Sequence, residues 1–366
     1  NKVEYTSMIG KGYYNTYTPA VILRNILENP AWYTPYTPYQ AEIAQGRLEM
    51  LLNYQTVCCD MTELPVASAS LLDEGTAAAE ALMLLTSNNK RKKTVLIDQN
   101  THPQTLDVIK TRAIGFDWNV QIITLPTDEK KIDEFLQTSI HDDVFGVLMS
   151  YPGSNGNVEH VPLITTKIKE KYGKKCGVAI ASDLLALASL TPPGQFHADV
   201  CFGSSQRFGL PMGYGCPHSA FLTTKAEFRR AMPGRMIGVS RDSRGLPALR
   251  MALQSREQHI RREHASSNIC TAQALLANMS AAYAIWHGQE GIKYISQKTH
   301  RAAYVTFEQL EKLLHNVQTN TKQQPFTLPV KHLFDTFVLQ FEDKNVLNQV
   351  VKKLQDNLIN VFVDNN

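Results

Sequence analysis

The sequence has no long hydrophobic run, little net charge and no C-x-x-C cysteine pair, and each absence excludes a class of protein. No apolar stretch is long enough to cross a bilayer, so we expect no membrane span. The formal net charge is only +3, and no basic stripe is interleaved with aromatic residues, so we expect no nucleic-acid partner. The six cysteines form no C-x-x-C pair and most lie among apolar residues, which favours buried thiols in a reduced compartment and no metal site.

The composition is that of a globular chain large enough for two domains. It has 366 residues, of which 43% are hydrophobic and 19% charged. We predict an N-terminal arm at residues 1–60, a large domain at 61–290 and the start of a smaller α/β domain at 291–366. Because the chain begins at Asn1 rather than Met and ends just after a predicted strand at 359–363, we expect it to be part of a longer polypeptide.

Between residue 94 and Phe202, short apolar strands alternate with helical segments. Such alternation predicts right-handed crossovers and a mainly parallel sheet with helices on both faces. Ligands of these sheets bind at the carboxyl ends of the strands, where we expect His102, Tyr151-Pro152 and Asp183 to meet. Strands are predicted at 94–98, 120–125, 144–150, 178–182 and up to Cys201 and Phe202, with helices at 104–112, 132–138 and 163–172.

Outside this region the patterns are less regular. Helices are predicted at 21–28 and 42–60, then up to Gly288 and again at 292–314, before a surface loop at 317–329. A strand at 336–341 and a helix at 345–358 precede the strand at 359–363.

A tyrosine- and proline-rich segment at 32–40 is predicted to be extended, because proline fixes φ and disfavours helix for the residue before it. It presents the hydroxyl side chains of Tyr33, Thr34, Tyr36 and Thr37. One interpretation is an arm that packs at a subunit contact, and the other is a lining for the mouth of an active site. The composition favours neither.

Gly75-Thr76 begins an Ala- and Leu-rich run that is a strong helix former. The free backbone N–H groups and the dipole of a helix start can bind a phosphate. A threonine at this position is more often an ordinary helix cap, so both interpretations stay open.

The stretch 178–217 holds the most informative motif: a strand, Asp183, a second strand, the polar segment Gly203-Ser204-Ser205-Gln206-Arg207 and a Gly-rich loop. It resembles the aminotransferase-like class of pyridoxal phosphate (PLP) enzymes, fold type I. In that class an acid faces the pyridine nitrogen, and a lysine after the next strand binds the cofactor. By this resemblance Asp183 is the acid, but Gln206 stands where the lysine would be, and a glutamine amide cannot form an imine. Lys225 lies too far along the chain to replace it.

Longer segments carry a more specific resemblance. The whole chain resembles the N-terminal half of glycine decarboxylase, the P-protein family of the glycine cleavage system. The segments that carry it are ENPAWYTPYTPYQAEIAQGRLEMLLNYQT (28–56), ASLLDEGTAAAEA (69–81), SDLLAL (182–187), GSSQRFGLPMGYGCPH (203–218), MPGRMIGVSRD (232–242) and the stretch 256–279. The chain departs from the family at Cys216, where glycine is usual, and at His264.

The resemblance implies a large α/β domain of the PLP-dependent transferase type and a polypeptide of two homologous halves, of which only the C-terminal half or partner subunit binds PLP. The expected activity is glycine dehydrogenase (decarboxylating), an oxidoreductase that acts on CH–NH2 with a disulfide acceptor. Glycine loses CO2, and its aminomethyl group passes to the lipoyl arm of the H-protein. The expected assembly is a homodimer or heterotetramer, in the mitochondrial matrix, or in the cytoplasm if the source is bacterial.

For this chain the resemblance implies a half that is inactive by itself, with Tyr33, Thr34, Tyr36 and Thr37 in the active-site wall. An alternative is a non-catalytic scaffold that docks the catalytic half and the lipoyl carrier. In either case the degenerate cofactor site of this chain would comprise Gly75, Thr76, His102, Asp183, Ser205 and Arg207. These residues could persist because the sheet packs around them, with Asp183 paired to Arg207, or because the site still binds a ligand.

Overall fold

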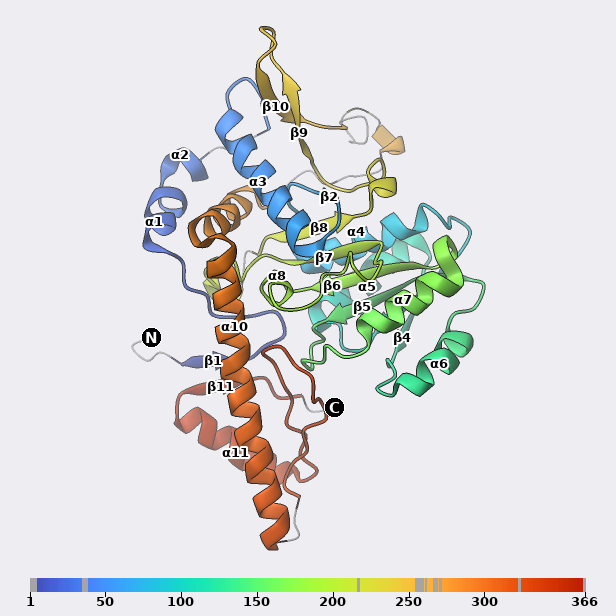
Figure 1. Ribbon diagram of the computed structural model, residues 1–366, viewed down its shortest axis with the longest axis vertical. Coiled ribbons are helices and arrows are strands. Elements are labelled where there is room, and N and C mark those ends of the chain that lie inside the picture. The colour runs from blue at the N-terminus through green and yellow to red at the C-terminus, as the bar shows by residue number, and fades with distance from the viewer. Residues whose placement is uncertain are drawn as a thin grey trace.

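The computed structural model describes residues 5–34, 39–215, 218–253, 260, 262–265, 269, 272–321 and 324–364. Its centre is a seven-stranded sheet in the order β2-β8-β7-β6-β5-β3-β4 (Figure 1). Strands β3 to β7 run parallel to one another, while β8 is antiparallel to both β7 and β2. This confirms the predicted α/β class with a mainly parallel sheet. The strands are β2 (Val66–Ala67), β3 (Thr94–Asp98), β4 (Asn119–Ile123), β5 (Val144–Tyr151), β6 (Gly177–Ser182), β7 (Val200–Ser204) and β8 (Ala220–Thr224).

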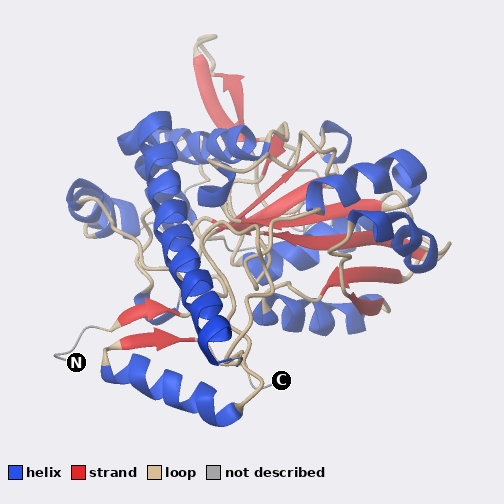
Figure 2. Cartoon of the chain, turned by 60° about the horizontal axis from the view of Figure 1, so that its bottom comes forward, coloured by secondary structure: helices blue, strands red, loops and turns tan. Residues whose placement is uncertain are grey.

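The central strands are apolar throughout because both faces of the sheet are covered. Along β3, Val95 and Ile97 pack on one face and Leu96 on the other, as the period of two requires. Helices α4 (Glu74–Thr86) and α5 (Pro103–Phe116) cover the first face. The opposite face packs against α3 (Gln45–Thr62), α6 (Ile132–Ser139), α7 (Val161–Tyr172), α8 (Leu184–Leu187) and the first part of α10 (Ala274–Thr321), and helices lie on both sides of the sheet in Figure 2.

The two ends of the chain pair with each other. Strand β1 (Thr6–Met8) runs parallel to β11 (Ile359–Val361), which follows α11 (Lys344–Asp356) (Figure 2). The helix and the last strand were predicted, but the partner strand was not, because three residues with one apolar side chain give no strand pattern. The division into arm, large domain and small domain stays a prediction.

Two predicted extended segments were wrong. Trp32 and Tyr33 lie in the short helix α2 (Pro30–Tyr33), since Asn29 caps it by accepting from the Ala31 N–H at 3.0 Å and Pro30 suits the first helical position. The segment 336–341 forms no strand: only Gln340 bridges to Thr327, while Phe337 packs edge-on against Phe307 of α10.

Helix α10 confirms the predicted interruption at Gly288, whose φ of 62° and ψ of −179° are not helical. The helix then continues to Thr321, past the predicted end at residue 314, so the start of the predicted loop at 317–329 is helical. The remaining short elements are α1 (Ala20–Ile22), the π-helix η1 (Leu23–Leu27) and the 3-10 helices η2 (Glu129–Lys131), η3 (Gly173–Lys175), η4 (Gly213–Gly215), η5 (Ala226–Phe228) and η7 (Arg262–His264). Within the described ranges, no helix is long and apolar enough to span a membrane.

A β-hairpin of β9 (Ile237–Arg241) and β10 (Pro247–Met251) projects from the sheet, at the top of Figure 1. Two glutamines of α3 hold its backbone by the same bidentate pattern. Gln55 accepts from the Ile237 N–H at 2.7 Å and donates to the Ile237 carbonyl at 3.1 Å. Gln45 makes the matching pair with Leu249, at 2.9 Å for each bond. Only Gln55 is buried.

These glutamines give a matched test of burial. We expect Gln55→Leu to lower the free energy of unfolding by about 2–3 kcal/mol, because it strands a buried N–H and carbonyl. Gln45→Leu should cost less than about 1 kcal/mol, since water replaces its bonds. Urea denaturation of both variants measures the difference, and equal costs would contradict the assignment.

Candidate functional site

A small cavity lies at the carboxyl edge of the sheet, after β5, β6 and β7. Its volume is about 40 Å³, which holds roughly three water molecules. The structure brings His102, Pro152 and Asp183 together here, as the strand order predicted. Tyr151, which was expected with them, does not line the cavity and packs against Phe196. The full lining is Gly12, Tyr14, Glu74, His102, Ser150, Pro152, Gly153, Ala181, Ser182, Asp183, Ser204, Gln206 and Arg207.

Arg207 fills the centre of this site. Its Nη1 lies 2.7 Å from Asp183 Oδ2 and 2.5 Å from Asp335 Oδ2, and the guanidinium stacks 4.1 Å from the centre of the Tyr14 ring. The residue is only 8% exposed. The Asp183–Arg207 pair that the packing interpretation required is therefore present. Asp335 and Tyr14 were not foreseen, because they come from distant segments that carry no recognisable motif.

Burial and neighbouring charges shift the pKa of both Asp183 and Arg207. Burial raises the pKa of Asp183, and Asp335 adds to this, while Arg207 opposes it. Burial works against the charge on Arg207, but Asp183 and Asp335 raise its pKa above the ordinary value. Burial also raises the pKa of Tyr14, so its phenol stays neutral. The result is a cation held by two acids and capped by an aromatic ring.

Gln206 is 1% exposed, and its amide fixes the backbone around the cavity. Its Nε2 donates to the Tyr14 carbonyl at 2.8 Å and to the Leu210 carbonyl at 3.0 Å. The hydroxyls of Thr16 and Thr18 donate to the carbonyls of Leu210 and Gly209. Residue 206 therefore ties the N-terminal segment to the loop after β7, where a lysine of the resembling enzymes would present an amine.

These residues do not fit a PLP molecule. Residue 206 offers no amine, and the carboxylate of Asp183 is already paired with Arg207. The cavity has a volume of only about 40 Å³, and Arg207 and Tyr14, which contact each other, form part of its wall. The geometry favours the packing interpretation of the degenerate site over ligand binding.

Gly75 and Thr76 do not line the cavity, although their neighbour Glu74 does. The Thr76 N–H donates to Asp73 Oδ1 at 2.7 Å, so a side-chain carboxylate caps α4. A Cβ at Gly75 would lie 2.9 Å from Val108 of α5, so this glycine allows the two helices to pack closely. A phosphate here would meet the acids Asp73 and Glu74, and the geometry favours the ordinary cap.

Ser205 points away from the cavity, contrary to its assignment to the degenerate cofactor site. Its hydroxyl accepts from Tyr54 and from Ser280, both at 3.1 Å, and donates to the Ser219 carbonyl at 3.2 Å. It is fully buried. The reason is the alternation of side chains at the end of β7: Ser204 faces the cavity, so the next residue faces the opposite side.

The proposed wall residues lie elsewhere on the chain. Tyr33 is 50% exposed at the end of α2, and the Thr34 hydroxyl donates to the Pro30 carbonyl at 2.5 Å. Neither side chain lines the cavity. Tyr36 and Thr37 lie outside the described residues.

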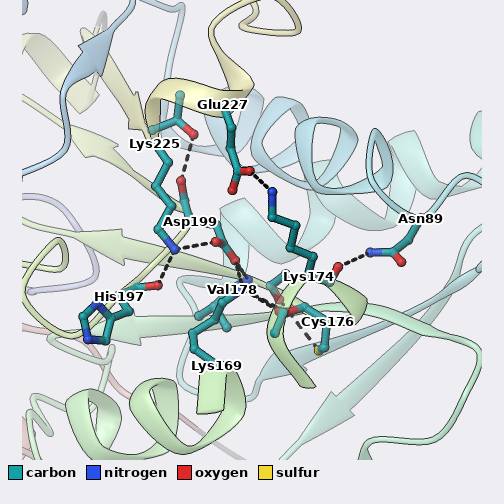
Figure 3. A network of polar contacts seen from close by, with 12 residues as sticks. Asn89, Lys169, Lys174, Cys176, Val178, His197, Asp199, Lys225 and Glu227 are labelled. Carbon is teal, nitrogen blue, oxygen red and sulfur yellow. Dashed lines mark hydrogen bonds and ion pairs between the residues drawn. The ribbon is translucent and has the colours of Figure 1, made fainter. Parts of the chain in front are cut away.

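Lys225 belongs to a separate network at the amino end of β7 (Figure 3). Its Nζ lies 2.7 Å from Asp199 Oδ1, and Lys169 Nζ lies 2.6 Å from Asp199 Oδ2. The Val178 N–H donates to the same carboxylate at 2.9 Å. Because this network is at the other end of the strand, Lys225 cannot serve the site around Asp183, as its position in the sequence predicted.

A buried acid beside the cavity predicts a pH effect. Asp98 lies at the end of β3 and is 2% exposed. Burial raises its pKa from 3.8 to about 6, although hydrogen bonds from the Asn100 and Ser150 N–H groups lower it in part. A raised pKa favours the neutral acid in the folded state, so the wild type loses stability as the pH rises from about 4 to 6.

The Asp98→Asn variant should not show this loss. We expect its free energy of unfolding, relative to wild type, to increase by about 3 kcal/mol between pH 4 and pH 7. Denaturation at several pH values measures it. Glu134→Gln, on the exposed side of α6, is the control, and a pH-independent difference for Asp98→Asn would contradict the prediction.

The parallel sheet with β8 antiparallel beside β7, and an acid directly after β6, defines the fold type I class of PLP-dependent enzymes. A cysteine desulfurase from Thermococcus onnurineus shares this fold with a TM-score of 0.63 and 13% identity, covering 97% of this chain and 83% of that chain. An alanine–glyoxylate aminotransferase from Nostoc gives a TM-score of 0.56 and 14% identity, covering 100% and 88%. At these identities the likeness concerns the fold alone.

The chain belongs to the glycine cleavage system P-protein family, which it matches over residues 1–366. It is 54% identical to a mitochondrial glycine dehydrogenase (decarboxylating) of Solanum tuberosum, covering 100% of this chain and 33% of the relative. A relative of the same name from Aliivibrio salmonicida is 52% identical, covering 93% and 33%. A solved glycine decarboxylase (P-protein) in inhibitor-bound form has a TM-score of 0.84 and 29% identity, covering 98% of this chain and 77% of that chain. The chain thus spans about a third of the length of its curated relatives.

Proposed function

We propose that this chain forms part of the half of a glycine dehydrogenase (decarboxylating) that carries no cofactor lysine. The observation that carries the proposal is the family match over residues 1–366. The resemblance places the cofactor lysine at residue 206, which is a glutamine in this chain. The assembled protein would remove CO2 from glycine and transfer the aminomethyl group to the lipoyl arm of the H-protein, whose disulfide accepts the electrons. PLP, held by the other half or by a partner subunit, would act as the electron sink.

This chain would support that reaction by forming part of the active-site wall rather than by binding the cofactor. The Arg207 cluster fills the degenerate site, where a catalytic half would bind a cofactor. The exposed Tyr33 hydroxyl would contribute to the active-site wall, where it could orient a substrate carboxylate without adding charge. The plant relatives are named mitochondrial, which supports a mitochondrial matrix location, and a homodimer or heterotetramer is the proposed assembly.

Borohydride reduction tests where the cofactor binds. The intact natural protein is reduced with PLP bound, and the labelled peptide is mapped. We expect the label on a lysine outside these 366 residues, since residue 206 has no amine. A label on any lysine within this chain would overturn the proposal, and an unreduced sample is the control.

Turnover of a Tyr33→Phe variant tests the wall. Loss of a hydroxyl that binds a charged substrate should lower glycine turnover about 10-fold or more. Tyr17→Phe is the control, because Tyr17 is 79% exposed and is not assigned to the wall. Unchanged turnover for Tyr33→Phe would favour the alternative, a scaffold that only docks the catalytic half and the lipoyl carrier.

A further inference from the structure

A second cavity lies at the opposite end of the sheet from Arg207. It opens where β3 and β4 begin and α4 ends, so Lys93 and Trp118, each directly before one of these strands, both line it. Its volume is about 370 Å³, within the range of small-molecule sites and far above the 40 Å³ at Arg207. The lining residues are Glu80, Met83, Leu84, Thr86, Ser87, Lys90, Lys92, Lys93, Phe116, Trp118, Ala231 and Pro233.

One wall of this cavity is aromatic and apolar. The rings of Phe116 and Trp118 are stacked, with centroids 4.9 Å apart and an angle of 24° between their planes. Met83, Leu84 and Pro233 complete the apolar surface. Phe145 and Arg112 also contact the rings of Trp118 and Phe116. A planar ring could pack edge-on or offset against the part of the pair that lines the cavity, because aromatic rings prefer such partners.

The rim of the cavity is positive. Among the described lining residues the one acid is Glu80, whose carboxylate pairs with Arg112 at 2.7 Å. Three lysines remain, of which Lys92 donates to the carbonyls of Val144 and Lys175, and Lys93 lies 3.4 Å from Asp117. In the part of the chain that the structure describes, the Lys90 ammonium has no hydrogen-bond or ion-pair partner.

The carboxyl end of α4 lies at this cavity and offsets the positive charge of the lysines only weakly. The carbonyl end of a helix carries about half a negative charge, which the lysine ammonium groups outweigh. The basic run Lys90-Arg91-Lys92-Lys93, whose composition alone indicates a solvated surface, thus borders a cavity with an aromatic wall. The two observations are independent and specify the same ligand chemistry.

We propose that this cavity binds a small organic anion with a planar aromatic body, such as an aryl carboxylate. The ring would pack edge-on or offset against Phe116 and Trp118, and the carboxylate would pair with Lys90. This site is separate from the degenerate cofactor site and does not depend on the proposed enzymatic function.

Calorimetric titration of the intact natural protein with 2-naphthoate tests the proposal. We expect saturable binding that weakens about fivefold in Lys90→Gln and at least tenfold in Ser87→Phe, whose ring would fill the cavity. Lys110→Gln, an exposed lysine on α5 outside the lining, should bind as wild type does. The uncharged 2-naphthamide should bind more weakly, and added salt should weaken the naphthoate alone.

Three results would overturn the proposal. The first is an absence of saturable binding at millimolar naphthoate, as expected if another part of the polypeptide covers the cavity. The second is equal affinity for naphthoate and naphthamide, which would exclude a role for the lysines. The third is an unchanged affinity in Lys90→Gln, a surface substitution that leaves the fold intact and keeps the test decisive even if Ser87→Phe does not fold.

Discussion

Arg207→Met is expected to lower the free energy of unfolding by about 3–5 kcal/mol. The substitution leaves Asp183 and Asp335 facing each other with no cation, and their side chains are only 17% and 7% exposed. It also removes the guanidinium that stacks on Tyr14, so the N-terminal segment loses one of its attachments. Chemical denaturation of wild type and variant measures the effect.

The ion pair between Lys167 and Asp133 is the matched control. Its atoms are also 2.7 Å apart, but the Asp133 side chain is 67% exposed. Lys167→Met should therefore cost less than about 1 kcal/mol, because water screens the pair and solvates the remaining carboxylate. If both variants lost the same free energy of unfolding, the buried ion pairs of Arg207 would contribute no more to stability than an exposed pair does.

Gly203→Ala is expected to cost about 3 kcal/mol, at the upper end of overpacking effects. A Cβ at this position in β7 would lie 1.9 Å from the Ser182 carbonyl oxygen and 3.0 Å from a ring carbon of Phe221. Neither backbone strand can yield without moving its neighbours. Since Asp183 and Arg207 follow these two strands, the variant should also loosen their ion pair.

Gly115→Ala is the same chemical change, but we expect it to raise the free energy of unfolding instead of lowering it. Gly115 lies in α5, and no atom would approach its Cβ within 4 Å. Alanine is the better helix former, so we expect a gain of about 0.5–1 kcal/mol. Thermal unfolding of the two variants separates the effects. A Gly203→Ala protein as stable as wild type would show that β6 and β7 do not approach as closely as described.

The sequence could predict elements whose signal is local. Strands buried on both faces read as short apolar runs, and the helices between them as separate periodic segments, so the parallel sheet and its order of elements followed. The convergence of His102, Pro152 and Asp183 followed as well, because the carboxyl ends of parallel strands share one edge. Gly288 interrupted its helix for an equally local reason.

Interactions between distant segments could not be predicted in this way. Strand β1 is recognisable only through its pairing with β11, and Trp32 and Tyr33 were assigned to an extended segment although Asn29 and Pro30 begin a helix there. Ser205 was placed in the cofactor site because its neighbours belong there, but the backbone turns its side chain into the core.

For the candidate site, the sequence by itself determined what cannot occur. Gln206 has no amine, whatever surrounds it, so this chain cannot form an imine at that position. What fills the site instead was decided by the tertiary structure, which brings Asp335, 128 residues away, and the ring of Tyr14 onto Arg207. The chemistry of a side chain is fixed by its covalent structure, whereas the partner of a buried charge is chosen by the packing of segments that are remote along the chain.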